Sequence, residues 1–140
     1  MISTELAREL RGKGLVWHPV SGDVFAIDSS ELEGDTFTVS DMTIEAHEFD
    51  TGTILGFNGT TEWALDSVAV ENALWLPRED QLRGLLGGTF VSLSTTDAGA
   101  FVVETAHDEN TERFEASDAE TAYARAVLAL IARATADAAS

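Results

Sequence analysis

The chain has 140 residues, 44% of them hydrophobic and 24% charged, a balance typical of a folded globular protein that excludes a disordered or fibrous one. Its 25 acidic residues against eight Lys and Arg give a formal net charge of −17, so we expect no nucleic-acid or membrane partner. The absence of cysteine excludes disulfides, thiol catalysis and cysteine-ligated zinc.

The first predicted elements are a helix and a β-hairpin. Ser3 is a suitable cap for a helix over Thr4–Arg11, which Gly12 and the following glycine would end. Alternating apolar residues then predict a hairpin of the strands Leu15–Val20 and Val24–Asp28. The core residues expected in this hairpin are Trp17, Phe25 and Ile27.

The middle of the chain predicts a meander of three or four antiparallel strands. Thr36–Ser40 and Met42–Phe49 alternate in polarity. Thr53–Phe57 and Thr60–Leu65 flank Asn58-Gly59, a pair that tolerates the two positive φ angles of a type I′ turn. We therefore expect a two-residue hairpin turn at Asn58-Gly59.

A short central helix is predicted after Pro77, whose missing N–H costs nothing in a first helical turn. Gly87 and Gly88 supply a left-handed stop for this helix. Its expected buried stripe consists of Leu82, Leu85 and Leu86.

Three more strands and a long helix are predicted in the last third of the chain. The helix opens on a capping box formed by Ser117 and Glu120, and we expect fraying over Ala134–Ser140. The strands are expected at Thr89–Leu93, Ala100–Thr105 and Thr111–Glu115.

These elements predict an α+β fold, a mainly antiparallel sheet with three helices packed on it. Leu6–Ile27 and Gln81–Val103 share a weak echo of short helix, glycine break, strand, turn and strand. The echo suggests two αββ-type halves, about 1–68 and 69–140, within a single domain over residues 1–140.

Two groups of residues are candidates for binding. An aromatic-rich hairpin beside a short helix could form a partner-binding platform from Phe57, Trp63, Trp75 and Arg78. Glu45 and His47 lie two residues apart on a predicted strand and could contribute to a metal site. The alternatives are that the tryptophans belong to the core, that Arg78 bridges a neighbouring acid, and that a histidine beside carboxylates, such as His47 near Glu45, occurs by chance in so acidic a chain.

Catalytic motifs are absent from the sequence. No Gly-x-Ser-x-Gly elbow supports a nucleophilic serine, and Gly84–Gly88 is not followed by the Lys and Ser/Thr of a phosphate-binding P-loop. We therefore expect no enzymatic activity and no cofactor. The acidic N-terminus and the short apolar run Ala126–Ala132, far below the ~20 residues that span a bilayer, favour a cytoplasmic protein.

Three stretches carry a family resemblance: Val39–His47, Phe57–Val68 and Leu74–Gly87. There the chain resembles a group of short acidic actinobacterial proteins that often carry a pilus-assembly label. The factor to which that label belongs looks like a MinD-type ATPase, and this chain lacks the P-loop of such enzymes. The second half is also similar to small phage and prophage proteins with an α-β-α sandwich, which implies no activity.

Three functions remain open from the sequence. The first is a protein-interaction or adaptor domain that binds another protein through its aromatic region or its acidic surface, with a basic partner or a homodimer both compatible. The second is a small-molecule or metal-binding domain with a pocket between sheet and helices. The third is an acidic nucleic-acid mimic.

Overall fold

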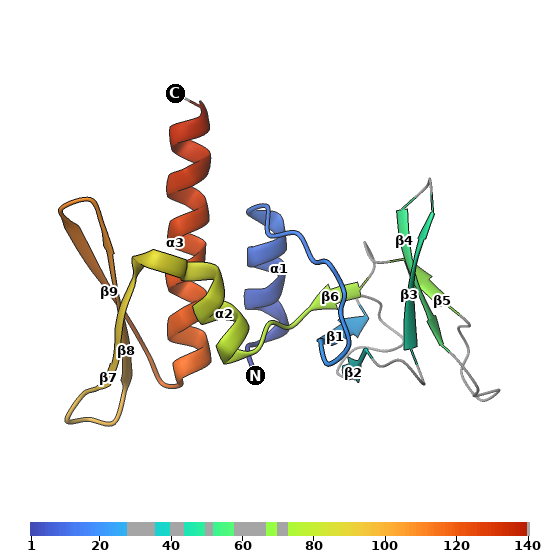
Figure 1. Cartoon of the computed structure of the whole chain (residues 1–140). Coiled ribbons are helices and arrows are strands. Elements are labelled where there is room, and N and C mark those ends of the chain that lie inside the picture. The colour runs from blue at the N-terminus through green and yellow to red at the C-terminus, as the bar shows by residue number, and fades with distance from the viewer. Residues whose placement is uncertain (28–35, 40–43, 50–51, 58–66, 70–72, 140) are drawn as a thin grey trace. The chain divides into compact units, whose positions relative to one another are not determined.

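The computed structural model describes residues 1–27, 36–39, 44–49, 52–57, 67–69 and 73–139 (Figure 1). These residues form three α-helices, nine β-strands and a 3₁₀ turn at Gly87–Thr89, so the fold is α+β, as the sequence predicts. The elements in chain order are α1 (Thr4–Gly12), β1 (Val24–Ile27), β2 (Thr36–Thr38), β3 (Ile44–Phe49), β4 (Gly52–Phe57), β5 (Ser67–Ala69), β6 (Ala73–Trp75), α2 (Glu79–Leu86), β7 (Phe90–Thr95), β8 (Phe101–His107), β9 (Asn110–Ala116) and α3 (Ala119–Ala139).

All strand pairing among the described residues is antiparallel and falls into three-stranded sheets. The strand orders are β2-β1-β6, β3-β4-β5 and β7-β8-β9. The antiparallel pairing confirms the expected sheet type. The local sequence patterns did not indicate the division into separate small sheets. They suggested one meander over residues 36–65, whereas β2 pairs with β1.

The chain divides into two compact units. Unit 1 consists of Met1–Leu15 and Pro77–Ser140, and unit 2 is Val16–Leu76. These bounds differ from the two halves expected from the sequence, which met near residue 68. The difference arises because β6 pairs with β1, which keeps residues 73–76 with the strands that precede them. The single-domain organisation stays a prediction.

Unit 1 is organised around α3. This helix packs on β8 and β9, and α1 and α2 pack on α3 (Figure 1). The large side chains buried in this unit, each at most 2% exposed, include Leu10, Leu82, Val103, Tyr123 and Val127. None of the helices in the described residues is long and apolar enough to cross a bilayer.

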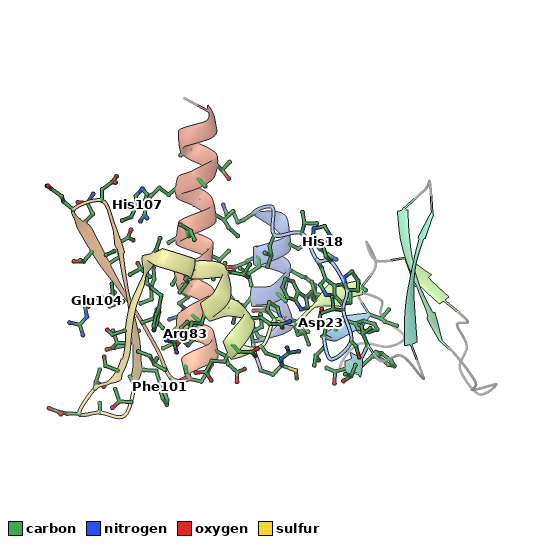
Figure 2. All side chains as sticks on the ribbon, viewed as in Figure 1. His18, Asp23, Arg83, Phe101, Glu104 and His107 are labelled. Atoms are coloured by element: carbon green, nitrogen blue, oxygen red, sulfur yellow. The ribbon has the colours of Figure 1, made fainter. Side chains whose placement is uncertain are left out.

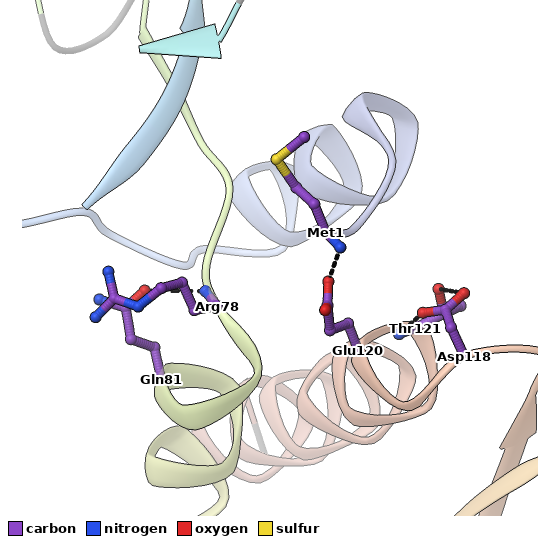
Figure 3. Close-up of polar contacts among 6 residues, drawn as sticks. All are labelled: Met1, Arg78, Gln81, Asp118, Glu120 and Thr121. Carbon is purple, nitrogen blue, oxygen red and sulfur yellow. Dashed lines mark hydrogen bonds and ion pairs between the residues drawn. The ribbon is translucent and has the colours of Figure 1, made fainter. Parts of the chain in front are cut away.

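Local signals explain how α1 and α2 begin and end. Ser3 Oγ accepts the backbone N–H of Leu6 at 3.1 Å, as expected of an N-cap. At α2 the backbone N–H of Arg78 donates to Gln81 Oε1 at 2.9 Å (Figure 3). Gly87, with φ of 55°, ends α2 in a backbone conformation that side-chain-bearing residues disfavour.

The buried stripe of α2 is narrower than predicted. Leu82 and Leu86 are 0% and 2% exposed, whereas Leu85 is 38% exposed. Residues four apart lie on one helix face, and Leu85 falls about 60° from Leu82 around the axis on the far side from Leu86. The expectation that Leu85 is buried was therefore wrong.

The cap of α3 is Asp118 rather than the predicted Ser117. Asp118 Oδ1 accepts the backbone N–H of Thr121 at 2.7 Å, and Oδ2 accepts the Thr121 hydroxyl at 2.9 Å (Figure 3). Glu120, the expected second half of the capping box, is instead ion-paired with the α-amino group of Met1. The helix continues to Ala139, beyond the point where we expected fraying.

The Asp118 cap predicts a small, pH-dependent stability effect. Asp118→Ala should lower the free energy of unfolding by about 1 kcal/mol at neutral pH, and Ser117→Ala by less than about 0.5 kcal/mol. Hydrogen bonds from the side chain and then the backbone of Thr121 lower the pKa of Asp118 below its ordinary value. A lowered carboxyl pKa stabilises the fold above the unfolded pKa, so the difference between wild type and Asp118→Ala should shrink below about pH 4. Urea denaturation followed at 222 nm, at pH 7 and pH 3.5, measures both effects. A constant difference at the two pH values would contradict the assignment.

In unit 2, β1 is the central strand of the sheet β2-β1-β6. Phe25 lies opposite Phe37 of β2 and Trp75 of β6. The strand predicted over Leu15–Val20 is absent, and these residues are irregular. Both edges of β1 are already occupied by β2 and β6, so no free edge of β1 remains for a hairpin partner.

The register of β4 gives its described neighbour on the side away from β3. Gly56 lies opposite Ser67 and Ile54 opposite Ala69, so this neighbour is β5. The predicted turn at Asn58-Gly59 and the predicted strand Thr60–Leu65 lie outside the described residues, so both stay predictions.

Candidate functional site

Trp75, one of the predicted partner-binding residues, is partly buried and packs against the core cluster of unit 2. Its ring stacks on Trp17 with centroids 6.4 Å apart and an interplanar angle of 10°. Trp17 in turn lies 5.4 Å from the ring of Phe25, which is fully buried. Trp75 Nε1 is buried without a hydrogen-bond partner in the described part of the chain. Trp75 is half-buried, so the structure places it largely within an aromatic cluster.

The other three residues of the predicted platform belong to other elements or lie outside the described residues. Phe57 is the last residue of β4, in a different sheet, and Trp63 lies outside the described residues. Arg78 precedes α2 in unit 1, and its Nε donates to Asp80 Oδ1 at 3.2 Å. This ion pair matches the alternative expected for Arg78, a bridge to a neighbouring acid. The role of all four residues in binding stays a prediction.

The predicted metal ligands Glu45 and His47 lie on β3. Their residues in register on β4 are Gly56 and Ile54, neither of which is a metal-binding residue type. Among the residues that the structure describes, no group of three or more His, Cys, Asp or Glu is placed to hold a metal ion.

A different candidate surface is the segment Val16–Val20, which is held in place by the buried carboxylate of Asp23. Asp23, 1% exposed, accepts the indole N–H of Trp17 at 2.9 Å and the backbone N–H of Val20 at 3.1 Å on the same oxygen, Oδ2. The main chain turns back at Gly22, whose φ is 96°, and Asp23 N–H donates to the Val20 carbonyl at 3.1 Å. Figure 2 labels Asp23 and His18 in this part of unit 2. Trp17 is thereby fixed inward on the aromatic cluster.

The residues that flank Trp17 point the other way. Val16 and Val20 are 65% and 59% exposed, and His18 is also exposed, while Trp17 is only 8% exposed. The segment therefore alternates between an anchored face and a solvent face that carries two apolar side chains. We call Val16–Val20 the Trp17 segment.

The charge of the chain is divided unequally between the two units. Unit 2 contains 12 Asp and Glu residues and no Lys or Arg, whereas unit 1 contains 13 Asp and Glu and all eight Lys and Arg. The formal charge is thus −12 on unit 2 and −5 on unit 1. An acidic composition adopted only for solubility gives no reason for every cation to lie in one unit.

Unit 1 has its own exposed apolar side chains. Val91 and Leu93 of β7 are 49% and 36% exposed, and β7 is an edge strand without a charged residue. Phe90 fixes the start of this strand, since its ring lies 5.8 Å from that of Tyr123 and 4.4 Å below the Arg83 guanidinium carbon.

Comparison of the chain with protein-family models, with curated proteins and with solved structures gave no match. The candidate surfaces therefore rest on geometry and charge alone.

Sequence reasoning missed Asp23, because nothing local distinguishes it among 25 acids. It also missed Val16 and Val20, although the uncharged run Leu15–Gly22 in so acidic a chain was an available signal.

Proposed function

We propose that the chain is a non-enzymatic protein-binding module whose unit 2 binds a cationic region of another protein. The observation that carries this proposal is the confinement of all Lys and Arg to unit 1, which leaves unit 2 with twelve acids and no cation. A unit of one charge sign attracts a partner of the opposite sign over its whole surface and speeds the encounter.

The Trp17 segment supports an apolar contribution to the same binding. Val16 and Val20 are exposed on a segment held by the Asp23 carboxylate, so they are presented to a partner with little loss of conformational entropy. Contacts through these valines do not depend on ionic strength, whereas the charge attraction is screened within about 10 Å at 0.1 M salt. The expected partner is therefore an amphipathic basic segment rather than a merely cationic polymer.

Neutralising acids in unit 2 should weaken this binding more than neutralising the same number in unit 1. The probe is a fluorescein-labelled peptide of alternating lysine and valine, with binding followed by fluorescence anisotropy at about 50 mM salt. Glu45→Gln/Glu48→Gln in unit 2 should weaken binding about fivefold, equivalent to about 1 kcal/mol for the loss of two charges. Asp97→Asn/Glu109→Gln in unit 1 makes the same change in net charge and should weaken binding less than twofold.

Two results would contradict the proposal. One is an absence of binding by the wild-type chain, and the other is an equal loss in both double variants, which would mean that only the net charge matters.

The valines are tested separately at about 500 mM salt, where charge attraction is weak. Val16→Ser/Val20→Ser should abolish the binding that persists at that salt, while Leu85→Ser, which alters an exposed leucine of unit 1, should leave it unchanged.

The remaining functional expectations from the sequence stay predictions. They are the metal or small-molecule site, the nucleic-acid mimic, and the link to pilus assembly that the resemblance to acidic actinobacterial proteins implies.

A further inference from the structure

The sheet of unit 1 has two edges, and only one of them is protected. In the order β7-β8-β9, β8 is paired on both sides, so β7 and β9 each have one side that pairs with no other described strand (Figure 1). No backbone hydrogen bond joins β7 to a second strand in the described part of the chain. Natural proteins usually blunt such edges with charges or a covering element.

The β9 edge carries these protections. Its residues include Glu112, Arg113 and Glu115, and Glu112 is ion-paired with Arg133 of α3. Arg125 of the same helix donates to the backbone carbonyl of Glu115 at 2.7 Å, which occupies an acceptor that an added strand could use. Pairing at β9 would therefore bury charges and displace an existing hydrogen bond.

The β7 edge carries none of them. Its six residues, Phe90 to Thr95, include no charged side chain and no proline. Val91 and Leu93 are exposed, and only the irregularity between Phe90 and Ser92 interrupts the ladder with β8. The regular part, Ser92–Thr95, is thus an open strand held in place by the packing of Phe90.

Charge complementarity selects the strand that fits this edge. A basic strand would find no carboxylate on β7 to pair with, and an acidic strand would be repelled by a chain of charge −17. An uncharged strand places no charge of its own beside β7, and a second β7 is such a strand. Pairing of β7 with a second β7 joins unit 1 to unit 1, and unit 1 is the unit that carries all the Lys and Arg residues.

We propose that the chain forms a two-fold symmetric homodimer in which β7 pairs antiparallel with β7 of a second copy. The pairing joins two three-stranded sheets into one of six strands, with the two-fold axis near Leu93 and Ser94, the middle of the regular part. This inference is independent of the proposed binding by unit 2, because it concerns the other unit and an uncharged contact.

Sedimentation equilibrium of the full chain tests the dimer. Over about 1–200 µM we expect a monomer–dimer equilibrium with a micromolar dissociation constant, because one strand pair buries less than the about 1,200 Å² of a stable interface. Higher salt should strengthen the dimer by screening two chains of like charge. The cationic peptide should show the opposite salt dependence, so failure of one proposal is distinguishable from failure of the other.

Matched variants locate the interface. Leu93→Lys should weaken the dimer at least about 30-fold, because pairing would place two lysines beside the axis. Thr111→Lys adds the same charge to exposed β9 and should leave the dimer unchanged. A monomer throughout the concentration range overturns the proposal, and so does a dimer that both variants affect equally.

A second measurement does not depend on the folding of the lysine variants. Because the chain has no cysteine, Ser94→Cys introduces the only thiol. A short bis-maleimide should cross-link Ser94→Cys to its copy in high yield, and Thr111→Cys should cross-link poorly under the same conditions. Equal cross-linking of the two variants overturns the assignment to β7.

Discussion

Asp23→Ala is expected to lower the free energy of unfolding of unit 2 by about 3 kcal/mol. The substitution removes the acceptor shared by the Trp17 indole and the Val20 backbone N–H. Both donors lose their acceptor in a site where the carboxylate itself is 1% exposed. A buried donor without a partner costs about 1–3 kcal/mol, and hydrogen bonds to a charged acceptor lie at the upper end.

Tryptophan fluorescence measures this effect selectively, because all three tryptophans of the chain lie in unit 2. Urea denaturation followed by the emission maximum gives the change in stability. Asp23→Asn keeps a neutral acceptor of the same shape and should cost less, about 1–2 kcal/mol. Asp97→Ala, an exposed acid between β7 and β8, serves as the control and should cost less than about 0.5 kcal/mol.

A double-mutant cycle separates the indole contact from the rest. In Trp17→Phe the indole donor is already gone, so the further change Asp23→Ala should cost about 1 kcal/mol less than it does in the wild-type chain. Strict additivity would show that the Trp17 contact contributes nothing. A cost below about 0.5 kcal/mol for Asp23→Ala alone would contradict the anchoring of the Trp17 segment, and with it the apolar part of the proposed binding site.

Elements defined by nearby residues could be predicted from the sequence. The cap at Ser3, the glycine stop at Gly87 and the hairpins of β7, β8 and β9 all depend on interactions within a few residues. Residues close in sequence are enough to specify such elements, and the structure has these elements close to the expected bounds.

Long-range pairing could not be predicted in the same way. The neighbour of β1 on one side is β6, nearly fifty residues away, and no local pattern specifies that pairing. Because β2 and β6 flank β1, the predicted strand Leu15–Val20 has no place beside β1, and these residues, which include the Trp17 segment, are irregular. The same pairing moves the boundary of the compact unit to Leu76.

The candidate site depends on a net charge that the sequence shows and on unit bounds that the sequence does not show. A basic protein partner is one expectation from the net charge and stays a proposal, whereas the concentration of that charge in unit 2 depends on where the unit begins and ends. Burial of apolar side chains also depends on contacts that the sequence does not show. Trp75 was a candidate contact residue with the core as the alternative, and it packs on Trp17. Val16 and Val20 were expected in a strand, and they are exposed.

Leu82→Ala is expected to lower the free energy of unfolding of unit 1 by about 2–5 kcal/mol. Leu82 is 0% exposed on α2, which packs on α3, the central element of this unit. Truncation to alanine removes three carbons from the core and leaves a cavity that the packed helices can fill only in part. Circular dichroism at 222 nm during urea denaturation reports the loss, because the described helices all belong to unit 1.

Leu85→Ala is the matched control on the same helix. It removes the same atoms three residues away from a side chain that is 38% exposed, so it should cost less than about 1 kcal/mol. The difference between the two variants reports mainly burial, because both variants make the same change from leucine to alanine within α2. Equal costs would mean that Leu85 is covered in solution and that α2 has a partner surface which the isolated chain does not show.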